Sequence, residues 1–251
     1  MMCGGLRSKG IKRELKEGLP IISIISIVRN DQAHIRETIE SVINQTYANI
    51  EYIVVDGGST DSTVEIIKEY EDKIDYWISE PDKGIYNANN KGFSYTTGDF
   101  INYMSSGDKF YNNDVIANIF PQYKDFDFIY GNTYMDGYKI IPEIVSEKMF
   151  LKQKTINHQA VFASRKCFDY LFDENLKVVA DRDWILANYR KKYSFKYVDV
   201  DVTVYDNTGV SSKPEKFNPD FLKFIKKNYN FFIYLYFYIR KKLGRLIKRY
   251  Y

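Results

Sequence analysis

The sequence contains few of the residues that build disulfide frameworks or metal clusters. Of its 251 residues, only two are cysteine, Cys3 and Cys167, and two are histidine. A fold held by disulfides is therefore excluded, and a reducing compartment such as the cytoplasm is expected. The N-terminus, MMCGGLRSKGIKRELKEG, has no apolar run long enough for a signal peptide. We expect residues 1–19 to form a frayed leader.

The sequence also lacks the common nucleotide-binding fingerprints, and its charge is unevenly distributed along the chain. No G-x-x-x-x-G-K-[ST] motif occurs, and no G-x-G-x-x-G follows the first apolar run, which excludes a P-loop and a dinucleotide fingerprint. From Phe221 to Tyr251 there are nine Lys and Arg residues and no acid, so the remaining chain carries 27 basic and 33 acidic side chains. An acidic body with a basic tail argues against nucleic acid as a partner.

The residues that are present predict an α/β fold. Hydrophobic residues make up 45% of the chain, which is enough for a packed core. From Pro20 to Asp108, apolar β-branched runs alternate with amphipathic segments, a pattern typical of a parallel, right-handed, doubly wound sheet. We expect strands at 20–28, 50–56, 75–80 and 99–108, with helices at 29–47, 59–71 and 84–96. The second half is less regular, with strands expected at 127–135, 158–164 and 196–205, helices at 115–120 and 180–192, and an edge strand or loop at 138–145.

Acidic residues follow three of the expected strands. Asp56, Asp82 and Asp108 lie at or just after strand ends, and the carboxyl ends of parallel strands share the edge where ligands bind. Gly57 and Gly58 allow close approach of the backbone or a positive φ. The pattern therefore predicts a polar cleft, although a strand ending in Asp-Gly before a capped helix also occurs for structural reasons alone.

Three motifs carry a family resemblance. ESVINQTY, VVDGGSTDST and DKGIYNANNKG occur in this order and are followed by TGDFINYMSSGD. The combination resembles the nucleotide-sugar half of the family 2 inverting glycosyltransferases of GT-A fold, closest to the branch that builds bacterial polysaccharides. The resemblance implies a Rossmann-like, mostly parallel central sheet with helices on both faces. It implies one domain over residues 20–215, with a nucleotide-sugar half at 20–108 and an acceptor half at 109–215.

The resemblance also implies roles for individual residues. The resemblance implies a UDP-linked donor, which would lie against the first strand end, the Asp-Gly-Gly turn, the Asp-Lys-Gly motif and the Ser-Ser-Gly-Asp turn. The residues implied are Ser26, Val28, Arg29, Asp56, Gly58, Ser59, Asp82, Gly84, Lys91, Ser106 and Gly107. Asp108 matches the last acid of the Asp-x-Asp metal motif, whose first acid is replaced here by Ser106. Diphosphate and water would then complete the coordination shell of a Mn²⁺ or Mg²⁺ ion.

Inverting transfer needs a general base near the acceptor hydroxyl. The family places it at a helix start, and ADRDW matches that place, with Asp181 as the base and Asp183 as the alternative. Both acids could instead only cap the helix. The resemblance further implies that His158 and Gln159 contact the acceptor or the sugar, although His158 could equally be a half-buried structural histidine.

The basic tail, residues 216–251, has an apolar stripe at helical spacing. The stripe comprises Phe232, Leu235, Tyr236, Ile239, Leu243, Leu246, Ile247 and Tyr250. FFIYLYFYI is too short to span a bilayer, which needs about 20 residues. A basic amphipathic helix favours an anionic membrane surface, here the inner face of the cell membrane, but the same face could also pack on the domain.

These observations predict a glycosyltransferase that moves a sugar from a nucleoside-diphosphate donor to a glycan or lipid-linked acceptor. Two alternatives stay open. The incomplete metal motif leaves room for a non-catalytic nucleotide-sugar-binding protein of the same fold, and the tail leaves room for a scaffold at the membrane surface.

Overall fold

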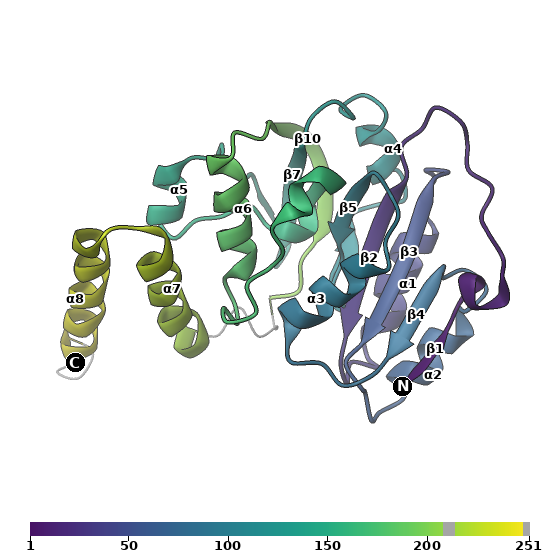
Figure 1. Ribbon diagram of the computed structural model, residues 1–251, viewed down its shortest axis with the longest axis horizontal. Coiled ribbons are helices and arrows are strands. Elements are labelled where there is room, and N and C mark those ends of the chain that lie inside the picture. Colours follow the sequence, from purple (N-terminus) through teal and green to yellow (C-terminus); the bar gives the residue numbers. More distant parts are fainter. Residues whose placement is uncertain (208–213, 248–251) are drawn as a thin grey trace.

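The computed structural model describes residues 1–207 and 214–247 as a central sheet between two layers of helices (Figure 1). The strands are β1 (Met2–Gly4), β2 (Ile22–Val28), β3 (Ile50–Asp56), β4 (Tyr76–Ser79), β5 (Phe100–Tyr103), β6 (Lys109–Phe110), β7 (Phe128–Met135), β8 (Tyr138–Ile140), β9 (Val161–Ser164) and β10 (Phe195–Val204). The helices are α1 (Ile35–Ile43), α2 (Thr63–Glu69), α3 (Ile85–Ser94), α4 (Val115–Ile119), α5 (Glu147–Leu151), α6 (Ala180–Arg190), α7 (Pro214–Asn228) and α8 (Phe231–Ile247).

The first half confirms the predicted parallel sheet. The strand order is β1-β4-β3-β2-β5-β9-β7-β10-β6, with β8 beside β7, and β4, β3, β2 and β5 are mutually parallel. In the register of β2 and β3, Val28 lies opposite Asp56. The carboxyl ends of these four strands therefore meet at one edge, as the β-α-β connections require.

The second half is mixed. β9 runs antiparallel to both β5 and β7, whereas β10 is parallel to β7 and β6 is antiparallel to β10. The strands β5, β9 and β7 are thus adjacent in space although β9 comes last of the three in sequence. This arrangement brings the segment before β9 to the edge at which β5 ends.

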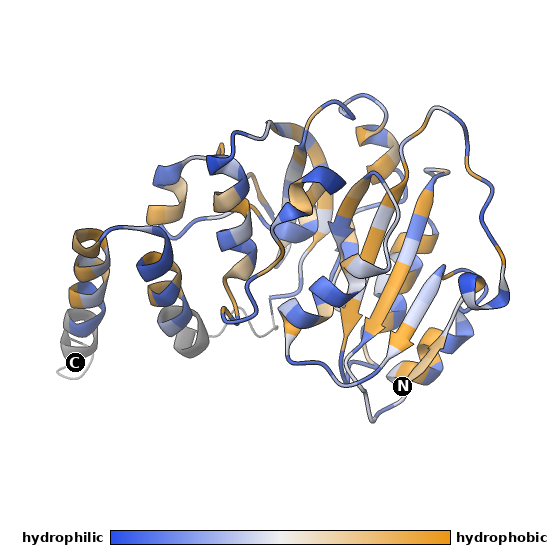
Figure 2. Cartoon of the chain, viewed as in Figure 1, coloured by the Kyte–Doolittle hydropathy of each residue, from blue (hydrophilic) through white to orange (hydrophobic). Residues whose placement is uncertain are grey.

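The central strands are largely hydrophobic (Figure 2). Their alternating side chains supply two cores, one on each face of the sheet. In β2, Ile25 and Ile27 face one side, where α3, α6 and α7 pack, whereas Ile22 and Ile24 face the other, where α1, α2 and α4 pack. Because both faces are covered, the parallel strands are mostly apolar on both faces rather than amphipathic, and the few polar residues within them are buried.

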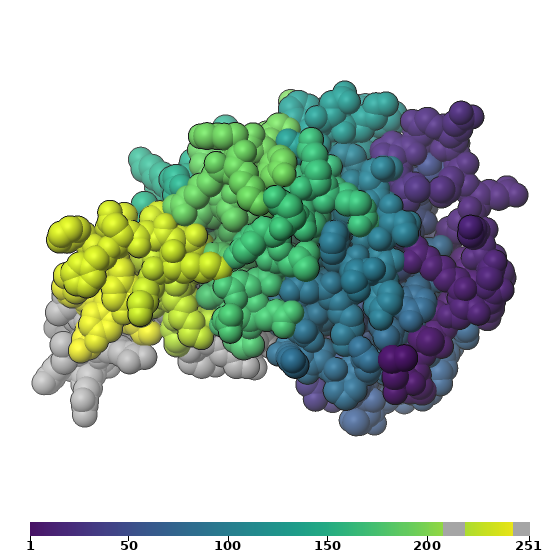
Figure 3. Space-filling view, in the orientation of Figure 1, coloured from purple at the N-terminus to yellow at the C-terminus, as the bar shows by residue number. Residues whose placement is uncertain are grey.

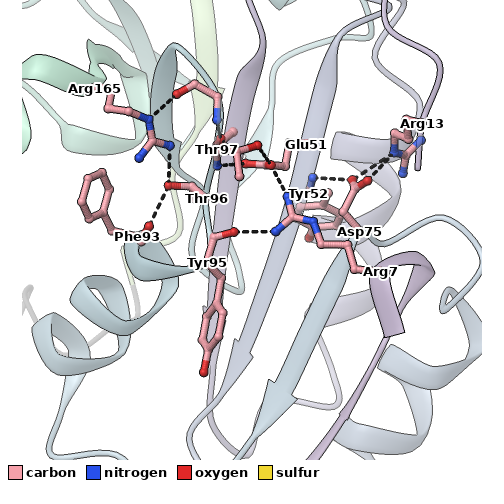
Figure 4. Close-up of polar contacts among 12 residues, drawn as sticks. Arg7, Arg13, Glu51, Tyr52, Asp75, Phe93, Tyr95, Thr96, Thr97 and Arg165 are labelled. Atoms are coloured by element: carbon pink, nitrogen blue, oxygen red, sulfur yellow. Dashed lines mark hydrogen bonds and ion pairs between the residues drawn. The ribbon is translucent and has the colours of Figure 1, made fainter. Parts of the chain in front are cut away.

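The N-terminal segment is not frayed, contrary to the prediction for residues 1–19. β1 pairs antiparallel with β4 at the edge of the sheet. Arg7 bonds the buried Glu51 carboxylate and donates to the carbonyl oxygen of Tyr95 at 2.5 Å (Figure 4). Arg13 Nε pairs with Asp75 Oδ1 at 2.9 Å. These contacts order the N-terminal segment. They could not be predicted from local sequence patterns, because they join residues that are distant in the sequence.

The C-terminal helices form the end of the molecule opposite the N-terminal segment, in yellow in Figure 3. α7 belongs to the core, since Phe221, Phe224 and Ile225 are buried. α8 packs on α7 through Phe237, whose ring centroid is 5.4 Å from that of Phe221. Among the described helices, none has the length and apolar character needed to cross a bilayer. Lys248, Arg249 and Tyr250 of the predicted amphipathic tail lie outside the described residues.

Candidate functional site

A cavity of about 870 Å³ opens at the carboxyl edge of the sheet. Its walls come from the loops after β2, β4, β5 and β10, from the segment before β9 and from the start of α6. Most of the predicted site residues line it: Val28, Arg29, Asp82, Gly84, Ser106, Asp108, His158, Gln159 and Asp181. The topology thus gathers residues that are up to about 150 positions apart, as expected for ligands at the carboxyl ends of strands.

Asp108 lies at the base of this cavity and is almost fully buried. Its Oδ2 accepts a hydrogen bond from Gln159 Nε2 at 2.7 Å, and its Oδ1 accepts one from the backbone N–H of Asp206 at 2.9 Å. Burial raises the pKa of Asp108 to about 7, although both hydrogen bonds act to lower it. A buried acid of this kind is costly to ionise unless a cation compensates its charge.

Asp181 lies in the first turn of α6, largely buried, and is held between two other elements. Its Oδ1 accepts a hydrogen bond from the hydroxyl of Tyr86 in α3 at 3.0 Å, and its Oδ2 lies 3.1 Å from Nδ1 of His158. Burial raises the pKa of Asp181, but the hydrogen bond and charge of His158 outweigh it, so the pKa is lowered. Asp181 and His158, predicted from separate motifs, therefore form one pair.

Asp183 lies on the other side of α6 and outside the cavity. Two helical positions correspond to a rotation of about 200°, so Asp181 and Asp183 cannot face the same site. Asp183 accepts hydrogen bonds from Tyr170 at 2.7 Å, Lys227 at 3.0 Å and Asn228 at 2.6 Å. The structure thus corrects the alternative assignment, because Asp183 anchors α7 to α6.

Asp56 holds the turn that follows β3 from inside. It is wholly buried and does not line the cavity. Its oxygens accept from Ser79 Oγ at 2.6 Å, from the N–H groups of Gly58 and Ser59 at 3.1 and 2.9 Å, and from Ser59 Oγ. Gly58 takes a φ of 77°. The Asp-Gly-Gly turn is therefore held by the side chain of the aspartate that ends β3. A direct contact between Asp56 and a donor stays a prediction.

Asp82 shows why the turn needs glycine. A Cβ on Gly57 would collide with Asp82 Oδ2, so the side chain of Asp82 rests directly on the Gly57 backbone. Asp82 Oδ1 accepts from the N–H of Gly84 at 2.8 Å, at the start of α3. Lys91 instead pairs with Glu80 at 2.7 Å and does not line the cavity.

Two further predicted residues also lie off the wall. Ser26 is buried two residues before the end of β2, where its hydroxyl accepts from Tyr52 at 2.9 Å. Gly107, with a φ of 93°, turns the backbone between Ser106 and Asp108 and donates to Thr38 Oγ1 at 3.1 Å. Both positions shape the strand ends that carry the lining residues.

Sequence reasoning missed Asp31, Tyr86 and Asp206, which line the cavity. Asp31 accepts from Ser106 Oγ at 2.7 Å, so its carboxylate lies beside the position where Ser106 replaces an acid. Its other oxygen lies 2.6 Å from His34 Nδ1. Asp31 and Asp206 could have been found from their position directly after a strand. No sequence signal marked Tyr86, because its position in the helix is typical of a core residue.

The donor set in this wall is compatible with a divalent cation. Asp108 and Asp31 offer hard carboxylate oxygens, but the described residues hold no group of three or more acidic, histidine or cysteine ligands. These two carboxylates alone would leave the coordination shell of a divalent cation incomplete.

Comparisons with known proteins assign the chain to a family. Residues 23–194 match the family described as Glycosyl transferase family 2. The chain is 31% identical over 213 residues to an uncharacterized glycosyltransferase of Mycobacterium tuberculosis H37Rv, covering 78% of this chain and 79% of that one. It is 27% identical over 201 residues to a PGL/p-HBAD biosynthesis glycosyltransferase of Mycobacterium bovis BCG, covering 76% and 78%.

Solved structures share the fold at low sequence identity. Staphylococcus aureus TarS 1-349 in complex with UDP-GlcNAc superposes with a TM-score of 0.67 at 18% identity, covering 82% of this chain and 64% of that one, just under two thirds. The mannosyltransferase PcManGT from Pyrobaculum calidifontis, in complex with GDP-Man and Mn²⁺, gives 0.64 at 14% identity, covering 88% and 68%. Together with the match of sequence over most of its length, these findings show that the chain belongs to glycosyl transferase family 2 and has the GT-A fold.

Proposed function

We propose that this glycosyltransferase moves a sugar from a UDP-sugar to a hydroxyl of a glycan or lipid-linked glycan, with inversion at the anomeric carbon. The observation that carries the proposal is the convergence of Asp82, Asp108 and Asp181 on one cavity at the carboxyl edge of the sheet. TarS, a neighbour of the same fold, is solved with UDP and with UDP-GlcNAc, which supports a uridine nucleotide as the first donor to test.

The donor would occupy the side of the cavity formed by the first half of the chain. Val28 ends β2 and Arg29 follows it, whereas Asp82 and Gly84 lie in the loop between β4 and α3, so the nucleotide would lie across these strand ends. The N-terminal amides of α3 favour the charge of a diphosphate. The other residues proposed for donor binding act through the backbone and loops that hold this wall: Ser26, Asp56, Gly58, Ser59, Lys91, Ser106 and Gly107.

Asp108, supported by Asp31, would hold a Mn²⁺ or Mg²⁺ ion together with the diphosphate. When bound, the cation would offset the charge that develops on the leaving diphosphate. Gln159 and the N–H of Asp206 fix the orientation of the Asp108 carboxylate. The acceptor hydroxyl would approach the part of the cavity lined by His158, Gln159 and Asp181, where its proton must be taken up.

Thermal-shift titration followed by a turnover assay tests the proposal. UDP, GDP and their sugars are titrated with and without Mn²⁺, since a ligand selective for the folded state raises the unfolding temperature. We expect UDP compounds to stabilise the protein most strongly with Mn²⁺, and UDP to be released when sugar acceptors are added. The absence of any nucleotide effect would refute the proposal, and binding without release of UDP from any donor would favour the non-catalytic alternative.

We further propose that α8 binds the protein to the anionic inner face of the cell membrane. α8 begins with mostly hydrophobic residues, and hydrophilic, basic residues follow them (Figure 2). Several large apolar side chains of its first turns are exposed. The exposed side chains are Phe231, Phe232, Tyr236, Tyr238 and Ile239.

Co-sedimentation with lipid vesicles tests this placement. The double variant Phe231→Ser and Phe232→Ser should lose binding to vesicles that contain phosphatidylglycerol, whereas Ile11→Ser, which removes an exposed apolar residue from the N-terminal segment, should not. Equal binding of both variants, or equal binding of the wild type to purely zwitterionic vesicles, would contradict it.

A further inference from the structure

The hairpin formed by β7 and β8, together with the residues that follow it, exposes many large apolar side chains. Four of the seven residues 138–144 are of this kind: Tyr138 is 77% exposed, Ile140 40%, Ile141 63% and Ile144 81%. Single exposed apolar residues are normal on a protein surface, but patches of them mark sites of interaction. The density of apolar side chains therefore indicates that this segment binds a ligand that shields it from water.

The register of the hairpin joins this surface to the cavity. Residues directly opposite each other in an antiparallel pair point to the same face of the sheet. Ile140 lies opposite Thr133, and Tyr138 lies opposite Met135. Thr133, Met135 and Ile140 line the cavity, as does Pro142 after β8. Tyr138 therefore continues the same face outward from the cavity. Met135, Tyr138 and Ile140 together form what we call the hairpin face.

The other face of the hairpin is polar and already has its partners. Tyr134 lies opposite Lys139 on this side. Lys139 Nζ pairs with Asp201 Oδ1 at 2.8 Å, and the Tyr134 hydroxyl donates to Asp201 Oδ2 at 3.3 Å. The hairpin is therefore amphipathic, and its apolar face is directed to the cavity rather than to a core. Packing within the described chain does not account for this apolar face, because it leaves Tyr138 and Ile140 exposed.

The place and charge of the hairpin face indicate what it binds. In the sheet, β7 is separated from β2 by β9 and β5, so the hairpin lies away from the strand ends proposed for the donor. Residues 136–144 carry two acids, Asp136 and Glu143, and one base, Lys139. A segment with this charge does not attract an anionic membrane or a diphosphate. A ligand that fills the acceptor part of the cavity and extends along this face would instead need an uncharged apolar portion.

We propose that the hairpin face binds the hydrocarbon portion of an amphiphilic acceptor, whose hydroxyl-bearing head lies in the cavity. This inference rests on the proposed function, and between a free glycan and a lipid-linked one it selects the acceptor that carries a lipid. The hydrocarbon leaves water when it covers Tyr138 and Ile140, and Ile141 and Ile144 extend the surface on which a longer chain can lie. Such burial raises affinity by up to about fourfold for each methylene group.

Transfer to acceptors that differ only in chain length tests the proposal. The methyl, butyl and octyl glycosides of a sugar that the wild type accepts are compared below the concentrations at which they form micelles. For the full-length wild type, kcat/KM should rise by at least about tenfold from the methyl to the octyl glycoside, mainly through a lower KM for the acceptor. In the double variant Tyr138→Thr and Ile140→Thr, this ratio should fall below about threefold. Threonine keeps the preference for a strand at both positions.

Lys139→Thr is the matched control on the same strand, because it changes the polar face of the hairpin. It should keep the wild-type ratio of octyl to methyl glycoside. Loss of the ratio in this control as well as in the double variant would show that the hairpin acts only through its structure, and would overturn the proposal. If the double variant does not fold, Ile141→Ser with Ile144→Ser, both at exposed positions, should lower the ratio, and an unchanged ratio would overturn it.

Other occupants of the hairpin face give other outcomes. A wild type that is dimeric by light scattering, with a monomeric double variant of unchanged ratio, would assign the face to a second copy of the chain and overturn the proposal. Loss of vesicle binding by the double variant, again with an unchanged ratio, would assign it to a membrane. An active wild type whose kcat/KM does not depend on chain length refutes the inference alone. A wild type that transfers no sugar from any UDP donor refutes the proposed function as well.

Discussion

Replacing Asp108 with Asn should stabilise the ligand-free protein at alkaline pH while removing its response to metal. Burial raises the pKa of Asp108 to about 7, whereas an exposed aspartate titrates near 4. The folded state therefore binds the proton more tightly than the unfolded state. The stability linked to this proton is fully present below about pH 4 and is lost as the pH rises through about 7.

The difference between the two pKa values sets the magnitude. About three units correspond to roughly 4 kcal/mol at pH 8.5, by 1.36 kcal/mol per unit. Asn cannot ionise, so Asp108→Asn should be more stable than the wild type by about that amount at pH 8.5, and by much less at pH 5. Asn can keep the bond from the N–H of Asp206, and Gln159 can turn its unpaired Oε1 toward the new amide. For a chain of this length, the unfolding temperature should rise by roughly 10 °C at pH 8.5.

The assay is urea and thermal unfolding of both proteins at pH 5 and pH 8.5 with EDTA present. Asp72→Asn, which removes an exposed carboxylate in the turn after α2, is the control. Addition of Mn²⁺ with UDP should then stabilise the wild type and leave Asp108→Asn unchanged. A variant that is less stable than the wild type at pH 8.5, or a difference that does not vary with pH, would refute the reasoning.

Three further predictions separate structural from functional residues. Asp183→Asn should lower the free energy of unfolding by about 1–3 kcal/mol and leave kcat unchanged, in urea unfolding and transfer assays; lost kcat at full stability would return Asp183 to the site. Gly57→Ala should weaken UDP binding in calorimetry by displacing Asp82, and unchanged affinity would remove Asp82 from the donor site. Arg7→Ala and Glu51→Gln should couple by at least about 0.5 kcal/mol in a double-mutant cycle, whereas strict additivity would contradict their ion pair.

The parallel half of the sheet could be predicted because its determinants are local. β2 and β3 are apolar on both faces, and each ends on the polar residue or turn that the carboxyl edge requires. Residues placed by that rule, such as Asp82 and Asp108, line the cavity. Asp56 satisfies the same rule but turns inward, since its neighbours Ser59 and Ser79 supply enough donors to bind both of its oxygens.

The acceptor wall could not be predicted at the same depth, because its determinants are long-range. Which acid of ADRDW faces the cavity depends on how α6 is rotated against the sheet, and this is set by packing of Trp184 and Ile185. The pairing of His158 with Asp181 depends on β9 entering antiparallel to β5, which no periodicity reveals. β1 was missed for a similar reason, since three residues gain strand structure only from the edge of β4.

Satisfaction of buried charge separates the two kinds of polar cluster in this protein. Glu51 receives bonds from Ser23, Thr97 and Arg7, and Asp183 receives three, so both clusters are complete without a ligand. Around the cavity the balance is different: Asp108 is buried with a raised pKa, and the segment before β9 has three unpaired atoms. Folding alone gives no reason to keep such costs, because apolar residues of similar shape would remove them. A charged donor and a polyhydroxyl acceptor are ligands of the kind that such groups could bind, which is in line with the site of transfer proposed above.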